Sequence, residues 1–341
     1  MISVGLIGYG YWGPNLLRNL MASPDFDVVA VADGDDARRA AAERLCPSAA
    51  LLASGEDVIA RDDVGAVVIA TPVATHYALA KSALGAGKHV LVEKPMCATV
   101  EEGQALIDLA AQKGVTLMVD HTFLFTGAVQ MLRELCRSGE IGRVSYYDSM
   151  RINLGLFQPD VNVMWDLAPH DLSIMDYLLD EEPVDIEVSG YCHVNPGVPD
   201  IVYLTLHFPS DMVAHFNLSW MSPVKVRRTA LGGSEKMVVW DDLNPEEKIK
   251  IYNSGVEFRP EEERRQIMPD YRIGDVLSPR VSPREALHGV VGHFAGVIEG
   301  RETSIMDGER GLRVVRILER AQHILDRRLP EIAALRHKVA P

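Results

Sequence analysis

A glycine-rich turn, GYGYWG at residues 8–13, lies close to the start of the chain, directly after the apolar segment Ile2–Ile7. The apolar segment is expected to form a buried strand. Gly8 permits a tight turn from this strand into a helix, and Gly10 lets the backbone approach a ligand closely. Gly13 lets the helix pack against the strand, and the unpaired N–H groups at its start favour an anion such as a pyrophosphate. The turn therefore predicts a strand–turn–helix unit built around a bound anion.

An acidic residue follows the second predicted strand. A helical pattern at Asn15–Met21 leads into an apolar strand at Val28–Ala32, and Asp33 comes next. A carboxylate at this place accepts hydrogen bonds from the ribose hydroxyls of an adenosine and repels a 2′-phosphate. The pattern therefore predicts NAD as cofactor in preference to NADP, although Arg38 or Arg39 could hold a phosphate. A structural turn followed by a surface aspartate is the alternative.

Length and charge limit the remaining possibilities. The chain has 341 residues, which favours two domains with separate cores. Its formal net charge of -14 argues against nonspecific binding to nucleic acid or to anionic membranes. The cysteines are dispersed and form no CxxC pair, so neither a zinc knuckle nor a disulfide framework is predicted, and a cytoplasmic location fits. We expect no membrane span and no signal peptide, because Pro14 and the glycines interrupt the N-terminal apolar segment.

The first third of the chain alternates short apolar strands with helical patterns. Further strands are expected at 49–52, 66–70, 89–92 and 115–119, with helices at 37–44 and 77–85. These strands are apolar on both faces, as parallel strands covered by helices are. Residues 1–122 are therefore predicted to form a Rossmann domain, a doubly wound α/β fold with a parallel sheet.

After residue 122 the pattern changes to longer strands with apolar residues at every second position. Residues 201–208 and 212–220 alternate in this way on either side of a Pro-Ser-Asp turn, which predicts a hairpin. Residues 123–341 are predicted to form an α+β domain with an open, mostly antiparallel sheet and helices on one face. The other face is mixed in polarity, and we interpret it as an oligomer contact, with solvent exposure as the alternative. Further elements are expected as strands at 143–151, 185–194, 225–232, 235–241 and 248–253, helices at 129–136 and 308–327, and a long loop at 256–284.

Two predicted parallel strands end in polar residues. Thr71 and Pro72 follow one strand, and Glu93, Lys94 and Pro95 follow the next. Both places lie at the carboxyl-end edge of the sheet, where ligands bind in such folds. A lysine at this edge can donate a proton or a hydrogen bond to a substrate oxygen. A solvated surface lysine is the alternative.

A second segment, VMWDLAPHDLSIMDYLLD at 163–180, contains Asp166 and His170. These residues are four apart and share one face if they lie on a helix. Pro169 is expected to mark the helix entrance, with His170 and Asp171 in the first turn. His170 suits general acid–base catalysis near neutral pH, and Asp166 could orient it. A packed structural histidine and a metal ligand are alternatives, but no third ligand follows from the spacing and no metal is predicted.

The motifs GYGYWG, Thr71-Pro72 with His76, GKHVLVEKP and WDLAPHD together resemble the Gfo/Idh/MocA oxidoreductase family, over essentially the whole chain. The resemblance implies a Rossmann domain, then a sheet domain through which homodimers or homotetramers form. It implies Lys94 and His170 as the catalytic pair. Asp166 is predicted as a third catalytic residue because it could orient His170. It also implies that Thr71, Pro72, His76 and Glu93 lie near the nicotinamide end of the cofactor. The predicted cofactor-binding residues are Gly8, Gly10, Tyr11, Trp12, Gly13, Asp33, Thr71, Pro72, His76, Glu93 and Lys94.

Further segments, among them DHTFLF, SWMSPVKVRR and YRIGD, resemble nucleotide-sugar 3-dehydrogenases that act on UDP-N-acetylglucosamine or its uronate. Basic residues on or near the second sheet would suit a pyrophosphate, and surface charges are the alternative. Many relatives carry Asn where His121 stands here. The predicted substrate-binding residues are His121, Arg151, Asn153, Trp165, Lys225 and Arg227, with Arg228 nearby.

These features predict an enzyme that transfers hydride between a nicotinamide and a secondary alcohol or ketone of a sugar. The 3-position of a UDP-N-acetylglucosamine-type nucleotide sugar is favoured, with Lys94 and His170 on opposite walls of one cleft. A dTDP-deoxysugar ketoreductase and an inositol or free-sugar dehydrogenase would use the same pair. An NAD-dependent glycosidase and a noncatalytic dinucleotide sensor are further alternatives, although a sensor needs neither Lys94 nor His170.

Overall fold

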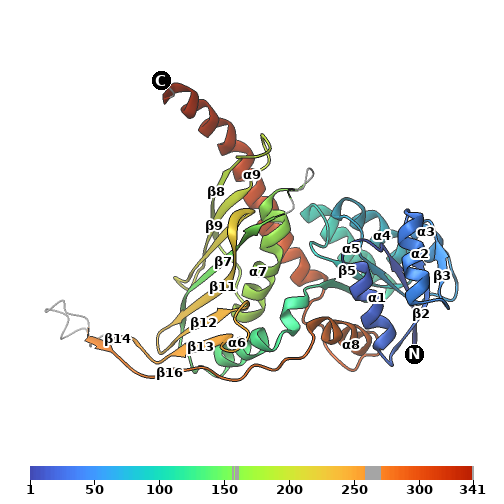
Figure 1. Ribbon diagram of the computed structural model, residues 1–341, viewed down its shortest axis with the longest axis horizontal. Helices are drawn as coiled ribbons and strands as arrows, with labels where there is room; N and C mark the ends of the chain where they lie inside the picture. Colours follow the sequence, from blue (N-terminus) through green and yellow to red (C-terminus); the bar gives the residue numbers. More distant parts are fainter. Residues whose placement is uncertain (156, 158–160, 258–269, 340–341) are drawn as a thin grey trace. The chain divides into compact units, whose positions relative to one another are not determined.

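The computed structural model describes residues 1–155, 157, 161–257 and 270–339, and the chain divides into two compact units (Figure 1). One unit contains Met1–Thr126 together with Arg284–Glu319. The other contains Gly127–Pro283 together with Arg320–Pro341. A segment from late in the chain therefore packs with N-terminal residues. The domain boundary between residues 122 and 123 stays a prediction.

The first unit contains a six-stranded parallel sheet with the order β3-β2-β1-β4-β5-β6. This order, which reverses next to β1, is that of doubly wound dinucleotide-binding sheets, so the predicted Rossmann architecture is confirmed. The predicted strands are all present, with small shifts at their ends. They are β1 (Ile2–Ile7), β2 (Phe26–Ala32), β3 (Ala50–Leu52), β4 (Ala66–Ile69), β5 (His89–Glu93) and β6 (Leu117–Asp120).

Helices and short 3-10 turns connect these strands. Thr99 caps α5 by accepting a hydrogen bond from the Glu102 N–H, and Gly114 ends the helix in the left-handed conformation. Leu312 and Val315 of α9 join the apolar core that the sheet and α5 form. The elements are α1 (Gly13–Ala22), α2 (Asp36–Leu45), α3 (Gly55–Ile59), η1 (Val73–Thr75), α4 (His76–Gly85), α5 (Val100–Lys113), η2 (Thr122–Phe125), α8 (Ala286–Ile298) and the first part of α9 (Gly308–Val339).

The second unit contains an eight-stranded sheet with the order β16-β13-β12-β11-β7-β10-β9-β8. Only β7 and β10 pair in parallel among the described strands of this sheet, so the predicted mostly antiparallel sheet is confirmed. The predicted hairpin joins β9 and β10. The strands are β7 (Val144–Leu154), β8 (Asp185–Tyr191), β9 (Ile201–His207), β10 (Val213–Ser219), β11 (Met221–Gly233), β12 (Met237–Asp241), β13 (Ile249–Tyr252) and β16 (Val276–Leu277).

Helices α6 (Gly127–Arg137) and α7 (Val163–Leu179) lie on one face of this sheet with the later part of α9, as predicted (Figure 1). Leu204, Phe216 and Leu218 alternate along the strands and are completely buried on that face. The opposite face leaves large side chains partly exposed, among them Tyr203 at 39%. The sheet therefore has one covered and one uncovered face.

The start of α7 differs from the prediction. The helix begins at Val163, where the Asn162 side chain accepts hydrogen bonds from the N–H groups of Met164 and Trp165. It continues through Pro169, so His170 lies in the middle of the helix and not in its first turn. A proline costs an internal helix one hydrogen bond, and here burial of most residues after it outweighs that loss.

Two predictions near the C-terminus are also wrong. The last helix extends well past residue 327, because α9 ends at Val339. Part of the predicted loop at 256–284 forms strands, namely β16, β14 (Gly255–Glu257) and β15 (Asp270–Arg272), of which β14 and β15 pair with each other. Residues 258–269 of that predicted loop lie outside the described residues.

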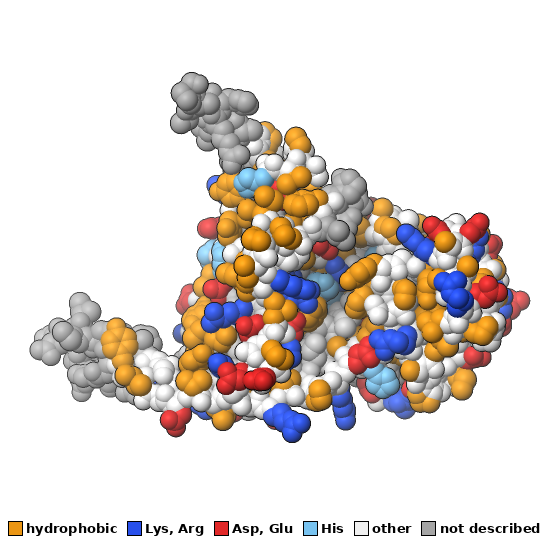
Figure 2. Space-filling view, viewed as in Figure 1, with side chains coloured by type: hydrophobic (Ala, Val, Ile, Leu, Met, Phe, Trp, Pro, Cys, Tyr) orange, Lys and Arg blue, Asp and Glu red, His pale blue; other side chains and the backbone are white. Residues whose placement is uncertain are grey.

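Charges of both signs are distributed over the surface. Figure 2 shows Lys and Arg side chains interspersed with Asp and Glu side chains over the face that it presents. Within the described part of the chain, no helix is both long and apolar enough to cross a membrane.

Candidate functional site

The three glycines of the first turn have different surroundings. Gly8 adopts φ +98, and a Cβ there would lie 2.5 Å from the Ala70 carbonyl oxygen. A Cβ on Gly13 would lie 2.5 Å from the Gly8 carbonyl oxygen. A Cβ on Gly10 would meet only the Arg38 guanidinium, at 3.8 Å. Gly8 and Gly13 are therefore required by the fold itself, whereas Gly10 borders open space that a ligand can use.

Asp33, at the end of β2, is held by its neighbours. Its Oδ2 accepts a hydrogen bond from the Tyr9 N–H at 2.7 Å, and its Oδ1 accepts one from the Asp35 N–H at 2.9 Å. Arg39 donates to the Asp33 carbonyl at 2.6 Å and pairs with Asp36. Arg38 lies with Nη1 3.7 Å from the Asp33 carboxylate, and its side chain is 55% exposed. Arg38, and not Arg39, is therefore the arginine placed to meet a ligand at this carboxylate.

Glu93 and Asp120 form a buried acid pair at the ends of β5 and β6, where they stand opposite each other in register. The two carboxyl groups lie close enough for each to influence the pKa of the other. Asp120 also accepts hydrogen bonds from Thr122 Oγ1 at 2.5 Å and from Trp12 Nε1 at 3.4 Å. Burial, followed by the charge of Asp120, raises the pKa of Glu93 well above its usual value. Burial and the neighbouring carboxylate therefore favour the protonated form of Glu93, next to Lys94.

Replacing Glu93 with Gln should stabilise the protein at pH 8 more than at pH 5. Because the folded pKa is raised, the wild type loses stability as pH rises from the ordinary value of 4.5 through the folded pKa. Gln cannot ionise and has nearly the same size and shape as Glu. The difference in the free energy of unfolding in urea should therefore favour the variant more at pH 8 than at pH 5. Glu134→Gln, at an exposed position, is the control. The same difference at both pH values would contradict a raised pKa of Glu93.

His76 joins the two loops that carry the candidate cofactor residues. Its Nδ1 lies 2.9 Å from the Pro95 carbonyl oxygen and its Nε2 lies 2.8 Å from the Thr71 carbonyl oxygen. The side chain is buried, and burial lowers its pKa. Pro72 lies between these loops as the residue before η1. His76 therefore contacts the backbone through both ring nitrogens, which suits a role in holding the loops in place.

His121 follows β6 and is only 2% exposed. Neither of its ring nitrogens has a hydrogen-bond partner within the described part of the chain, and the same holds for Oε1 of Glu93. Burial, together with the charge of Lys94, lowers the pKa of His121 to about 3. Buried polar atoms normally have partners, so orphaned ones beside Lys94 fit a site that a polar ligand completes. Together with the open space at Gly10, these residues fit a bound dinucleotide. Tyr11, in the same turn as Gly10, is 92% exposed.

The second unit positions the other candidate catalytic residues on α7. Asp166 and His170 lie one helical turn apart, on the same side of the helix. Asp166 Oδ2 accepts a hydrogen bond from Trp220 Nε1 at 3.1 Å. The backbone oxygen of His170 accepts one from Ser173 Oγ at 2.9 Å. Trp220 therefore fixes the Asp166 carboxylate from the neighbouring sheet.

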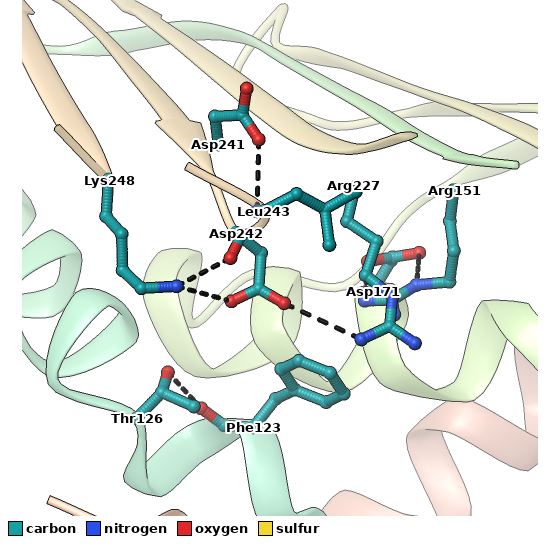
Figure 3. A network of polar contacts seen from close by, with 9 residues as sticks. All are labelled: Phe123, Thr126, Arg151, Asp171, Arg227, Asp241, Asp242, Leu243 and Lys248. Atoms are coloured by element: carbon teal, nitrogen blue, oxygen red, sulfur yellow. Dashed lines mark hydrogen bonds and ion pairs between the residues drawn. The ribbon is translucent and has the colours of Figure 1, made fainter. Parts of the chain in front are cut away.

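The predicted substrate-binding residues of the second unit have varied surroundings. Arg151 is buried and bonds to Asp171 through two hydrogen bonds of 2.8 Å, and Arg227 lies 3.6 Å from Asp242 (Figure 3). Trp165 Nε1 donates to Gln322 at 3.1 Å. Asn153 is half-buried, and Lys225 is exposed where β11 shifts register against β7.

Sequence reasoning missed the partners of these residues. Asp171 stands next to His170, and Asp242 belongs to the acidic stretch that follows β12, so both were visible as charged residues without an assigned role. Lys248 lies 3.5 Å from the Asp242 carboxylate and completes this set. No group of three or more His, Cys, Asp or Glu side chains that could hold a metal ion occurs among the residues that the structure describes.

Comparison with known proteins supports the assignment of the fold. Residues 2–121 match the model described as "Oxidoreductase family, NAD-binding Rossmann fold", and residues 129–239 match the GFO/IDH/MocA C-terminal domain. UDP-N-acetylglucosamine 3-dehydrogenase of Acidithiobacillus ferrooxidans is 30% identical over 318 residues, which cover 91% of this chain and 93% of the relative. A crystal structure of that enzyme superimposes with a TM-score of 0.81 at 26% identity and covers 96% of this chain and 99% of the other.

One further relative is named for NADP, and one further similar structure contains NAD. The scyllo-inositol 2-dehydrogenase (NADP(+)) of Bacillus subtilis is 29% identical over 167 residues, which are 48% of this chain and 44% of the relative. An enzyme of gentamicin A biosynthesis, solved in complex with NAD, has the same fold, with a TM-score of 0.78 at 21% identity and coverage of 94% of this chain and 92% of the other. From the two matched domains and the relative that spans almost its whole length, the chain belongs to the Gfo/Idh/MocA oxidoreductase family.

Proposed function

We propose that the protein oxidises the 3-hydroxyl of a UDP-N-acetylglucosamine-type nucleotide sugar, or reduces the corresponding ketone, with NAD as cofactor. The observation that carries the proposal is the setting of Lys94. It follows β5 at the carboxyl-end edge of a Rossmann sheet, beside orphaned buried atoms of Glu93 and His121. The similarity to UDP-N-acetylglucosamine 3-dehydrogenase over 91% of the chain supports the choice of substrate.

In this mechanism His170 removes the proton from the sugar hydroxyl as a general base. Lys94 donates a hydrogen bond to the same oxygen and stabilises the negative charge that develops there. Asp166, held by Trp220, orients the imidazole and stabilises its protonated form. When bound, NAD supplies the hydride acceptor. Reduction of a ketone uses the same side chains with the proton transfers reversed.

A panel of sugars tests the substrate assignment. Thermal-shift measurements with UDP-, dTDP- and GDP-sugars and with free inositols should show the largest rise in melting temperature for UDP-acetamido sugars, because a ligand stabilises the state that it binds. Absorbance at the NADH wavelength should then rise with that sugar and NAD. If a dTDP-sugar or an inositol gave the largest rise, that compound would replace the UDP-sugar as the proposed substrate. Release of free sugar without net NADH would establish a glycosidase instead.

We infer that Asp33 selects NAD over NADP, and that Arg38 would bind the 2′-phosphate of NADP once the Asp33 carboxylate is removed. Asp33→Ser should lower the NAD-to-NADP ratio of kcat/KM by about 10-fold or more, because it removes the charge that repels a 2′-phosphate. Arg38→Ala in the Asp33→Ser background should restore part of the ratio. The ratio compares kcat/KM for two cofactors on the same variant, so a general loss of activity affects both values equally and does not change it. An unchanged ratio in Asp33→Ser would contradict the inference.

We also propose a homodimer or homotetramer formed through the uncovered face of the second sheet, in the cytoplasm. Tyr146, Met150 and Tyr203 are between 37% and 39% exposed on that unit, which favours a contact surface. Light scattering should give a mass of two or four chains, and Tyr203→Glu should shift it towards one chain. A monomeric wild type would contradict the assembly, and cell fractionation tests the location.

A further inference from the structure

The turn of α7 that carries His170 is attached to β7 at two points. Arg151 donates from Nε to Oδ2 and from Nη2 to Oδ1 of Asp171, both at 2.8 Å (Figure 3). The Tyr147 hydroxyl donates to the backbone oxygen of Asp171 at 3.3 Å. Side chains alternate along a strand, so Tyr147 and Arg151, four apart, lie on the same face of β7. Strand β7 therefore holds Asp171 by both its carboxylate and its carbonyl.

This attachment lies directly after a turn of the helix that lacks one of its hydrogen bonds. Pro169 is inside α7 and provides no N–H, so the preceding turn loses one internal hydrogen bond. His170 and Asp171 are the next two residues. The contacts from β7 therefore fix, from outside the helix, the residues directly after the turn that lacks this hydrogen bond.

The chemistry of the pair favours orientation over stability. Arg151 and Asp171 are 3% and 2% exposed, and a buried bidentate pair defines both a distance and an angle. Such a pair is a weak source of stability, because apolar residues of similar size often replace it without loss. Arg227 stands opposite Arg151 in register across β7 and β11, and Asp242 lies beside that second guanidinium. Asp171 therefore keeps Arg151 as its partner although another cation lies close by.

We propose that Arg151, Asp171 and Tyr147 are positioning residues that hold His170 in the orientation in which it exchanges a proton with the substrate. The proposal rests on the proposed role of His170 in the reaction. It assigns Arg151 to the geometry of α7, in place of the substrate contact that its charge suggests in the sequence.

The test removes the pair without leaving a lone buried charge. In the double variant Arg151→Met/Asp171→Leu, kcat should fall by about 10–100-fold. A general base that is shifted even slightly from its productive position takes the proton much more slowly. The KM for the nucleotide sugar should change less than about threefold, since the ground-state contacts of the sugar stay in place. The melting temperature should stay close to that of the wild type.

A second Arg–Asp pair provides the matched control, because it anchors the other end of the same helix. Arg133 donates to the Leu178 carbonyl at 3.0 Å and to Asp180 at 2.7 Å. The control is Arg133→Met/Asp180→Asn, with Asn chosen because residue 180 has a positive φ. Its kcat should stay within about twofold of the wild type. Equal kcat values in the two folded double variants would overturn the proposal.

Two further measurements cover the other outcomes. Arg151→Lys keeps the charge but loses the two-pronged geometry. If the double variant does not fold, this variant must show the selective loss of kcat, and wild-type kcat in it would overturn the proposal. In carbon–proton NMR spectra of labelled histidine, the His170 signal, assigned with His170→Gln, should be single in the wild type and broadened or split in the Arg151 variants. Full turnover by His170→Gln would refute the proposed function itself, whereas an inactive His170→Gln beside fully active Arg151 variants would refute only the positioning role.

Discussion

Replacing Lys94 with Met should lower kcat by about 100–10,000-fold while the fold and the affinity for NAD stay close to those of the wild type. Met keeps the length of the side chain but removes the ammonium group that donates to the sugar oxygen. Lys94 follows the last residue of β5, and its Cα position is fixed by the strand and not by its charge. Steady-state turnover with the sugar identified in the panel, together with fluorescence titration of NAD, measures the two effects separately.

The control for this variant is Lys113→Met. Lys113 lies in the last turn of α5, is exposed, and has no place in the proposed site. Its turnover should equal that of the wild type. Turnover within threefold of the wild type in Lys94→Met, with confirmed binding of NAD and sugar, would remove Lys94 from the mechanism.

Gly10→Ala should weaken NAD binding by about 10–100-fold without lowering the melting temperature. A Cβ at this position meets only the end of the Arg38 side chain, at 3.8 Å, so the protein without cofactor accepts it. The new methyl group would instead occupy the space in which we expect the pyrophosphate. Isothermal titration with NAD, beside a thermal melt without it, separates binding from stability.

Gly8→Ala is the matched opposite. Its Cβ would lie 2.5 Å from the Ala70 carbonyl oxygen at a φ of +98, so we expect a loss of about 2 kcal/mol or more in the free energy of unfolding. If Gly10→Ala binds NAD as the wild type does, the cofactor does not lie over this turn. If both variants are equally destabilised, the different surroundings of Gly8 and Gly10 do not determine the stability of the folded protein.

The fold of the first unit was predictable because its signals are local. Each parallel strand is a short apolar run, and the three glycines mark the first turn. The errors came where tertiary contacts override a local rule. Pro169 normally begins a helix, yet burial and the Asn162 cap carry α7 through it. The packing of Arg284–Glu319 with the N-terminal unit likewise depends on contacts that no local pattern reports.

The candidate site likewise has residues that the sequence predicts and contacts that only the folded structure reveals. Lys94, His170 and Asp33 stand out by residue type at marked places in the pattern. The pairing of Glu93 with Asp120 depends on the register of β5 and β6, and the bond between Arg151 and Asp171 depends on how α7 lies on β7. A sequence shows a buried arginine and a surface arginine as the same letter. For that reason the basic residues of the second sheet could be assigned to a ligand but not to their protein partners.

We propose above that hydride passes from the 3-carbon of a nucleotide sugar to a nicotinamide on this protein. Incubation of the wild-type protein with NAD and UDP-N-acetylglucosamine deuterated at carbon 3 tests it, with the NADH that forms analysed by mass spectrometry. We expect NADH that carries the deuterium, with turnover slowed relative to the protonated sugar. Unlabelled NADH, or no NADH with a sugar that demonstrably binds, would contradict this transfer of hydride.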